Sequence, residues 1–251
     1  MKKLLLLALC LLISACAARA PRVETGETDT VWGKMQATSH AAAGPYRLQL
    51  SMRFGEEGNT RRVTGVLWGN DSRNLRLDVM AGVGAILAKI QESPDAFILY
   101  APRENRAYRH TGPQRPMLKI GIPVPFDLQS LAELLNGRFA QVFGDAYLTA
   151  NADGSGASYE IDGPLAGELV LDAAGAPVAW KQAGGAWTLK LAYNENEPLK
   201  PKSLKLANIN GQQAIIMVKQ RETPEPFDPS QLELAIPPGT VTLPLSRYRP
   251  S

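Results

Sequence analysis

Near residue 50 the chain alternates strictly between apolar and polar side chains. In the segment YRLQLSMRF every second residue, from Tyr46 to Phe54, is apolar, and the residues between them are polar. Successive side chains of a β-strand point to opposite faces of a sheet, so this alternation predicts a strand with one face in a core and the other in water. The polar GEEGNTRR that follows predicts a hairpin turn.

Similar short patterns recur along most of the chain. Predicted strands of the first half are VTGVLWG, NLRLDVM, AILAKIQE, AFILYAP and RAYRH, and those of the second half are AYLTAN, ASYEIDG, GELVLDAAG, PVAWKQ, AWTLKLAYN, SLKLANI and QQAIIMVKQRE. Gly184-Gly185 and Asn210-Gly211 supply turn residues for two hairpins. We expect the proline-rich tail that starts at Thr223 to wrap around the edge of the sheet.

One helix is predicted clearly, between the sixth strand and the seventh. Asp127 is a suitable N-cap, the leucines from Leu128 to Leu135 mark one helical face, and Asn136-Gly137 is a typical stop. A second, short helix is predicted from Thr28 to Ser39. Together these patterns predict a mainly β protein with helices (α+β), in which about a dozen antiparallel strands form one curved sheet or open barrel with a helix against its concave face.

The first sixteen residues carry a targeting signal. Lys2 and Lys3 precede an apolar run that ends at Ile13. This run is shorter than the ~20 residues needed to span a bilayer, and with its basic start it is typical of a secretory signal. It leads into LISAC, which resembles the lipobox of bacterial lipoproteins, where Cys16 would receive a diacylglyceryl group. The alternative is an ordinary signal peptide with an incidental cysteine. We expect residues 1–15 to be a signal peptide, 16–30 a lipidated tether and 31–251 one folded domain.

A lipobox implies a permanent anchor in the cell envelope. Two or more acyl chains, such as palmitate, bind membranes stably because each buried methylene contributes ~0.8 kcal/mol. Ala17, in the place where an aspartate would favour retention in the inner membrane, implies the periplasmic face of the outer membrane. Without Lys2 and Lys3 the chain has 25 basic and 24 acidic residues, which gives no electrostatic reason to expect nucleic acid as a partner.

Catalytic motifs are sparse. The chain has two histidines, His40 and His110, and lacks the sequence patterns HExxH, CxxC, GxSxG and the phosphate-binding loop. We therefore expect a protein that is not an enzyme and that has no cofactor and no metal. A hydrolase built on paired carboxylates stays open, because acidic residues are plentiful.

Several of these segments together resemble one family. The turn Gly121-Ile122-Pro123-Val124-Pro125 before the leucine-rich helix, and the segments VLDAAGAPVAWKQ and PKSLKL, look like those of the LolA/LolB lipoprotein-localisation family. The resemblance implies an open half-barrel of about eleven strands, with a helical lid over an apolar cavity. It also implies a protein that accepts acylated lipoproteins from a LolA-like periplasmic carrier and inserts them into the outer membrane.

The resemblance also suggests site residues. The apolar loop MAGVG corresponds to a protruding loop that contacts the membrane, which makes Met80 and Val83 candidates for that role; the alternative is that they fold back onto the sheet. Candidates for the cavity lining are the apolar residues on the inward phase of the strands and on the helix: Leu48, Leu50, Met52, Leu75, Leu77, Leu131, Leu134, Trp187, Leu189 and Leu191. The same positions would also suit a filled core.

Two other functions remain consistent with the sequence. One is an anchored protein that binds phospholipid or another apolar ligand. The other is a structural or assembly lipoprotein that docks another envelope protein. The expected partners are thus the membrane, through the N-terminal acyl chains, and acylated lipoproteins or other lipids.

Overall fold

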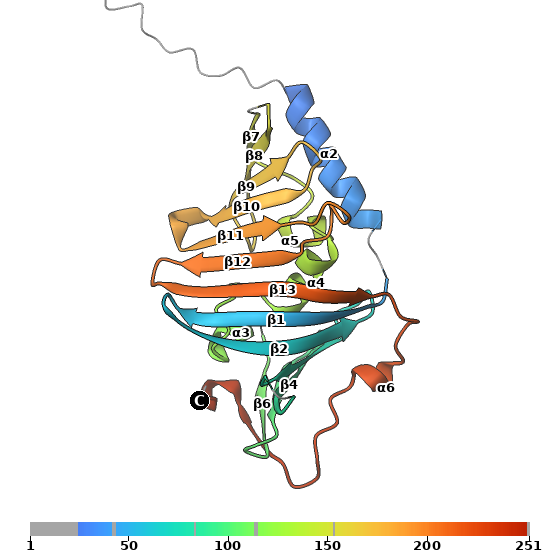
Figure 1. Ribbon diagram of the computed structural model, residues 1–251, viewed down its shortest axis with the longest axis vertical. Coiled ribbons are helices and arrows are strands. Elements are labelled where there is room, and N and C mark those ends of the chain that lie inside the picture. Colours follow the sequence, from blue (N-terminus) through green and yellow to red (C-terminus); the bar gives the residue numbers. More distant parts are fainter. Residues whose placement is uncertain (1–24, 42–43, 83, 113–114, 153, 250–251) are drawn as a thin grey trace, which may run out of the picture.

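A single β-sheet contains all fourteen strands of the computed structural model, which describes residues 25–41, 44–82, 84–112, 115–152 and 154–249 (Figure 1). The strands lie in the order β14-β6-β5-β4-β3-β2-β1-β13-β12-β11-β10-β9-β8-β7. All neighbours are antiparallel except β14 and β6, which are parallel. The predicted fold class is confirmed in outline, a mostly β protein built on one large, open, curved sheet.

The strands of the first half run from Tyr46–Glu56 (β1) through Asn59–Gly69 (β2), Leu75–Met80 (β3), Ile86–Glu92 (β4) and Phe97–Ala101 (β5) to Arg106–His110 (β6). Those of the second half are Thr149–Ala152 (β7), Gly156–Ile161 (β8), Gly167–Asp172 (β9), Pro177–Gln182 (β10), Trp187–Ala192 (β11), Ser203–Asn208 (β12), Gln212–Glu222 (β13) and Val241–Pro244 (β14).

Strand β1 lies at the centre of the sheet and joins its two halves. It pairs with β2 on one side and with β13 on the other, although β13 follows more than 150 residues later in the chain. The inward side chains of β1, from Tyr46 to Met52, are buried, as the alternation predicts. Because β1 is long and paired along both edges, it forms the floor of the concave face.

The helical cover, which we define as α3 (Pro116–Lys119), α4 (Leu128–Asn136) and α5 (Ala140–Phe143), lies in one connection. This connection joins β6, next to one edge of the sheet, to β7, at the other edge. The chain therefore has to cross from one edge to the other, and the helical cover packs into the same hydrophobic core as the inward side chains of the sheet.

Helix α2 (Thr25–Ala41) packs beside β7, β8 and β9 (Figure 1). Val31, Trp32 and Met35 are buried, and the helix extends beyond both ends of the predicted 28–39. The last residues of the expected tether, 25–30, are thus helical. The turn between β9 and β10 approaches this helix closely at Gly175, where a Cβ atom would lie 2.8 Å from the Cβ of Lys34.

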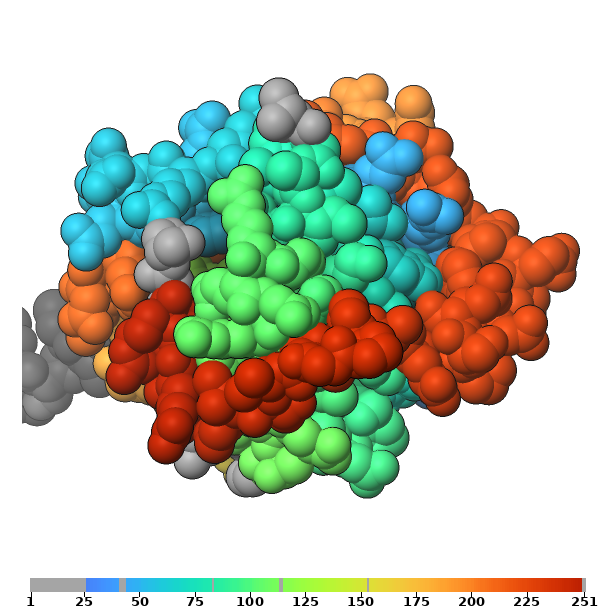
Figure 2. Space-filling model, turned by 90° about the horizontal axis from the view of Figure 1, so that it is seen from below, coloured from blue at the N-terminus to red at the C-terminus, as the bar shows by residue number. Residues whose placement is uncertain are grey.

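The C-terminal tail closes the edge of the first half of the sheet, as predicted. It passes through α6 (Pro229–Leu232), forms β14 beside β6, and ends in a short 3-10 helix, η3 (Leu245–Arg247), which contacts α3. A second short 3-10 helix, η2 (Ala183–Gly185), lies between β10 and β11. Figure 2 shows the tail in red across the strands of the first half.

The strand count differs from the expected eleven partly because the tail adds β14, a pairing without a local sequence signal. Within the described residues, no helix has the length and apolarity to cross a membrane.

Candidate functional site

Helix α4 packs into the core on the concave side of the sheet, beside β13 (Figure 1). Its N-cap is Asp127, whose side chain accepts a hydrogen bond from the backbone N–H of Ser130 at 2.8 Å, and it ends at Gly137 in the left-handed conformation with φ of 81°. Both ends are where the sequence predicts them. The leucines from Leu128 to Leu135 are fully buried, so the apolar face of the helix packs entirely against the core.

All ten predicted lining residues lie in one continuous hydrophobic core. The eight on the sheet point to the concave side and the two on α4 point back at them; Leu191 is the most exposed, at 7 %. The members are Leu48, Leu50, Met52, Leu75, Leu77, Leu131, Leu134, Trp187, Leu189 and Leu191. The structure brings the predicted set together between the sheet and α4. That these residues line a lipid site stays a prediction.

Side chains from the sheet hold both ends of α4. At the N-terminal end, the Glu92 carboxylate on β4 accepts hydrogen bonds from the backbone N–H groups of Leu128 at 2.9 Å and Gln129 at 3.4 Å. At the C-terminal end, the Arg221 guanidinium on β13 donates to the carbonyl of Leu135 at 2.7 Å. An anion at the N-terminus and a cation at the C-terminus both complement the helix dipole.

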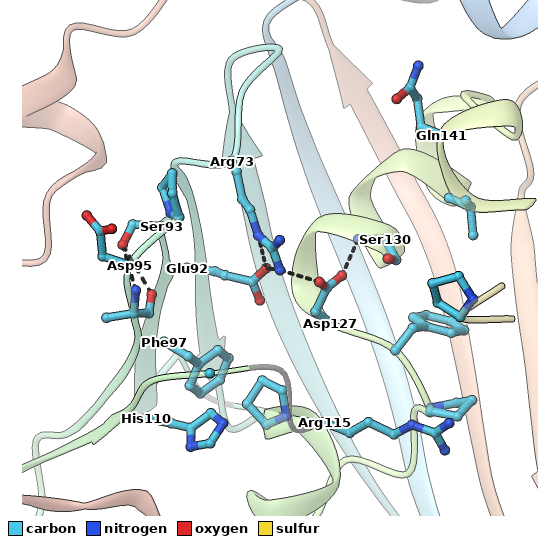
Figure 3. A pocket seen from close by; sticks show the side chains of 18 of the residues that line it. Arg73, Glu92, Ser93, Asp95, Phe97, His110, Arg115, Asp127, Ser130 and Gln141 are labelled. Atoms are coloured by element: carbon cyan, nitrogen blue, oxygen red, sulfur yellow. Dashed lines mark hydrogen bonds and ion pairs between the residues drawn. The ribbon is translucent and has the colours of Figure 1, made fainter. Parts of the chain in front are cut away.

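Arg73, in the turn between β2 and β3, joins the two carboxylates at the start of α4. Its guanidinium lies 3.3 Å from Glu92 and contacts Asp127 (Figure 3). Glu92 is only 3 % exposed. Burial, and then the negative charge of Asp127, raise the pKa of the Glu92 carboxyl above its usual value, while the Leu128 N–H and Arg73 act in the opposite direction.

A pocket of about 540 Å³, which we call the mouth pocket, opens beside this cluster. It reaches from Glu92 and Phe97, at the ends of β4 and β5, to Leu165, in the turn between β8 and β9, so both halves of the sheet contribute to it. Charged groups and apolar side chains such as Phe126 share its wall. The volume is within the range of small-molecule sites.

The two histidines line different pockets. His110, at the end of β6, is half-buried in the mouth pocket, while the exposed His40, at the end of α2, lines a second pocket near α4. Among the residues that the structure describes, no three His, Cys, Asp or Glu side chains are grouped as metal ligands would be.

The predicted membrane-contact loop lies between β3 and β4. Met80 is the half-buried last residue of β3. The loop is closed by hydrogen bonds from the Ala81 N–H to the Ala85 carbonyl at 2.8 Å and from the Gly84 N–H to the Ala81 carbonyl at 2.9 Å. Val83 and the predicted lipid-attachment residue Cys16 lie outside the described residues.

Sequence reasoning identified Asp127 but missed the other charged residues that hold α4, Glu92, Arg73 and Arg221. Glu92 is the last residue of AILAKIQE and occupies the inward phase of that strand, after Ala88 and Ile90. A carboxylate at an inward position is a signal of a buried, partnered charge. Arg73 carries no such signal, because it lies in an irregular turn.

The described residues thus define an open, curved β-sheet protein with a helical cover held over its concave face by side chains. No family model and no curated protein sequence matches the chain. Solved structures do match. A LolA superfamily protein from Nitrosomonas europaea has a TM-score of 0.53 at 9% identity, covering 83% of this chain and 98% of its own.

Two more structures show the same similarity. A putative outer membrane lipoprotein-sorting protein domain from Vibrio parahaemolyticus has a TM-score of 0.51 at 11% identity, covering 82% of this chain and 97% of its own. A DUF1329 family protein from Desulfovibrio piger has a TM-score of 0.52 at 7% identity, with the same coverage. The chain has the LolA-like fold, and at the level of fold the expected resemblance is confirmed.

Proposed function

We propose that this chain is a membrane-anchored lipoprotein that binds acyl chains between α4 and the concave face of its sheet. One observation carries the proposal: α4 covers a continuous apolar surface but is fastened at its ends by the side chains of Glu92 and Arg221. A helix fastened in this way can move off the sheet without breaking a strand pairing. The buried leucines of both surfaces would then face the acyl chains.

The chemistry of the surface fits this ligand. Each methylene of an acyl chain costs ~0.8 kcal/mol when it is exposed to water, so a protein that carries such chains must offer an equivalent apolar surface. The ten buried residues of the predicted lining supply it. The mouth pocket, beside the N-terminal end of α4, is a natural entrance.

The finer role follows from the N-terminal sequence. Acylation at Cys16 would hold the domain at the periplasmic face of the outer membrane. There it would take acylated lipoproteins from a soluble LolA-like carrier and pass them to the bilayer, with the loop that contains Met80 and Val83 contacting the lipid. The LolA-like fold supports this role, because two of the solved structures that share the fold are a LolA superfamily protein and a lipoprotein-sorting domain.

A second candidate function rests on the filled core. Because α4 and the sheet pack together with almost complete burial, the domain would also suit a structural or assembly lipoprotein that docks another envelope protein. A third candidate is an anchored protein that binds a different lipid. It would use the same movement of α4 but carry another cargo.

Native mass spectrometry of the full chain with Cys16→Ser, purified from the periplasm under mild conditions, separates these functions. A co-purifying acylated lipoprotein supports the receptor role, and free phospholipid supports the binding of a different cargo. A bare protein that also fails to bind a fluorescent fatty acid contradicts the proposal and favours the structural role.

A further inference from the structure

A second pocket, of about 400 Å³, shares Arg73 with the mouth pocket. We call it the polar pocket, because every residue that lines it is polar: Ser39, His40, Asp71, Ser72, Arg73, Gln129, Ser130, Glu133, Arg138 and Gln141. Arg73, Ser130 and Gln141 line both pockets, so the two are adjacent.

Two buried charges form the inner wall of the polar pocket. Glu133 and Arg138 are each 5 % exposed, and the Arg138 guanidinium donates to the Glu133 carboxylate at 2.6 Å. Arg138 also contacts Asp71. The side-chain amide of Gln129 donates to Glu133, and its own carbonyl oxygen is buried without a hydrogen-bond partner within the described residues. A buried acceptor of this kind is usually satisfied by a ligand or water.

The polar pocket and the apolar core lie on opposite faces of one helix. Leu128, Leu131 and Leu134 of α4 point into the core, while Ser130 and Glu133 point into the polar pocket. A molecule with an apolar part under α4 and a polar part emerging at the mouth pocket would therefore meet the polar pocket next.

We propose that the polar pocket receives the first polar residues of the polypeptide that follows an acylated cysteine. This inference rests on the proposed function, since it requires the acyl chains to lie under α4. Peptide groups carry both a donor and an acceptor, which suits a lining with hydroxyl, amide, guanidinium and carboxylate groups. An acyl chain would leave the buried charges of Glu133 and Arg138 without water, at a high cost.

The charges argue against a phosphate group as the occupant. Arg73 is paired with Glu92 and Asp127, and Arg138 with Glu133 and Asp71, so neither guanidinium offers an excess positive charge. A phosphate would instead add negative charge to a pocket that the carboxylates of Asp71 and Glu133 already line. A neutral, polar peptide avoids this repulsion.

The test compares two ligands on the full chain carrying Cys16→Ser. One is tripalmitoyl-cysteine amide, and the other is the same lipid followed by the peptide Ser-Gly-Asn-Ser-Gly. Their affinities are measured by displacement of a fluorescent fatty acid. We expect the peptide to tighten binding roughly tenfold, the effect of one or two net hydrogen bonds.

The variant for this test combines Ser72→Leu with His40→Leu, because both side chains are exposed and line only the polar pocket. In it the ratio of the two affinities should fall to about one. The matched control is Lys190→Ala, which lies exposed on the convex face and should keep the tenfold ratio.

Each outcome has a definite meaning. A tenfold ratio that is lost in the double variant and kept in the control supports the inference. If both lipids displace the probe equally well, the peptide site is overturned while the proposed function stands. If neither lipid displaces the probe, the proposed function fails, and the peptide site fails with it.

Discussion

The Glu92 carboxylate, at the end of β4, accepts a hydrogen bond at 2.9 Å from the backbone N–H of Leu128, the first residue of α4. This contact joins an inward position of the sheet to the start of the helix that covers it. A side-chain hydrogen bond thus attaches α4 to the sheet, whereas backbone hydrogen bonds attach neighbouring strands to one another. The side-chain contact can break while the strands stay paired.

Replacing Arg73 should loosen α4 selectively. In Arg73→Ala the buried Glu92 carboxylate loses its nearest cation. Because Arg73 is half-exposed, we expect a loss of about 1 kcal/mol in the free energy of unfolding. Amide hydrogen exchange should become faster in residues 128–136 and stay unchanged in β13. Arg53→Ala, exposed on the convex face of β1, is the control; equal acceleration in both variants would rule out a selective effect.

The titration of Glu92 should make the free energy of unfolding depend on pH. Its pKa is raised in the folded protein above the usual value of 4.5, so the folded state holds the proton more tightly than the unfolded state does. The contribution of Glu92 to stability therefore falls as the pH rises from about 4.5 through the raised pKa.

Glu92→Gln lacks this titration. The stability of the wild type relative to Glu92→Gln should thus be lower at pH 8 than at pH 5, as measured by urea unfolding. Burial also raises the pKa of Glu133, to about 7, but Glu133 titrates in both proteins and cancels in the difference. If the stability of the wild type relative to Glu92→Gln is independent of pH, or rises with pH, the result contradicts a raised pKa of Glu92 in the folded protein.

Gly175 tests how tightly α2 is packed. Its φ is +84°, and a Cβ atom there would lie 2.8 Å from both the Cβ of Lys34 and the backbone nitrogen of Met35. We expect Gly175→Ala to destabilise the protein by about 2 kcal/mol, from overpacking and backbone strain together. Gly239, with φ of +79° and no atom within 4 Å of such a Cβ, isolates the strain. In thermal unfolding, Gly239→Ala should destabilise the protein clearly less than Gly175→Ala. Equal losses of stability would mean that α2 shifts easily to make room for the added methyl group.

The loop between β3 and β4 should matter for release of cargo. A double variant, Met80→Glu with Val83→Glu, places two charges where an apolar loop would enter the bilayer. We expect it to bind a fluorescent lipopeptide normally and to transfer it to lipid vesicles at least tenfold more slowly. Ile209→Glu is the control, because Ile209 is 76 % exposed in another turn. Normal transfer by the double variant would exclude the loop from release.

Local sequence patterns predicted most of the elements. The alternation from Tyr46 to Phe54 is strand β1, and Asp127 and Gly137 bound α4 as expected. The patterns could not predict which strands are neighbours across long distances. The pairing of β1 with β13 and of β14 with β6 depends on the whole sheet, which is why the final strand was not expected as a separate element.

The site was less predictable than the fold. Alternating apolar residues such as Leu75 and Leu77 mark the inward face, but a filled core and a lipid cavity require the same pattern. The charged cluster around α4 joins Arg73, Glu92 and Asp127, which are up to 54 residues apart, and only the folded chain brings them together.

Fluorescence quenching by a lipopeptide with brominated acyl chains would test the central claim most directly. Trp187 is buried in the hydrophobic core on the concave face, which the proposed acyl site shares, while Trp68 lies on the convex face, opposite Arg76. Two full-chain variants with Cys16→Ser each keep one of these tryptophans, with phenylalanine at the other three. The account predicts that the lipopeptide strongly quenches Trp187 and leaves Trp68 nearly unchanged. Binding that quenches Trp68 and not Trp187 would contradict an acyl site between α4 and the sheet.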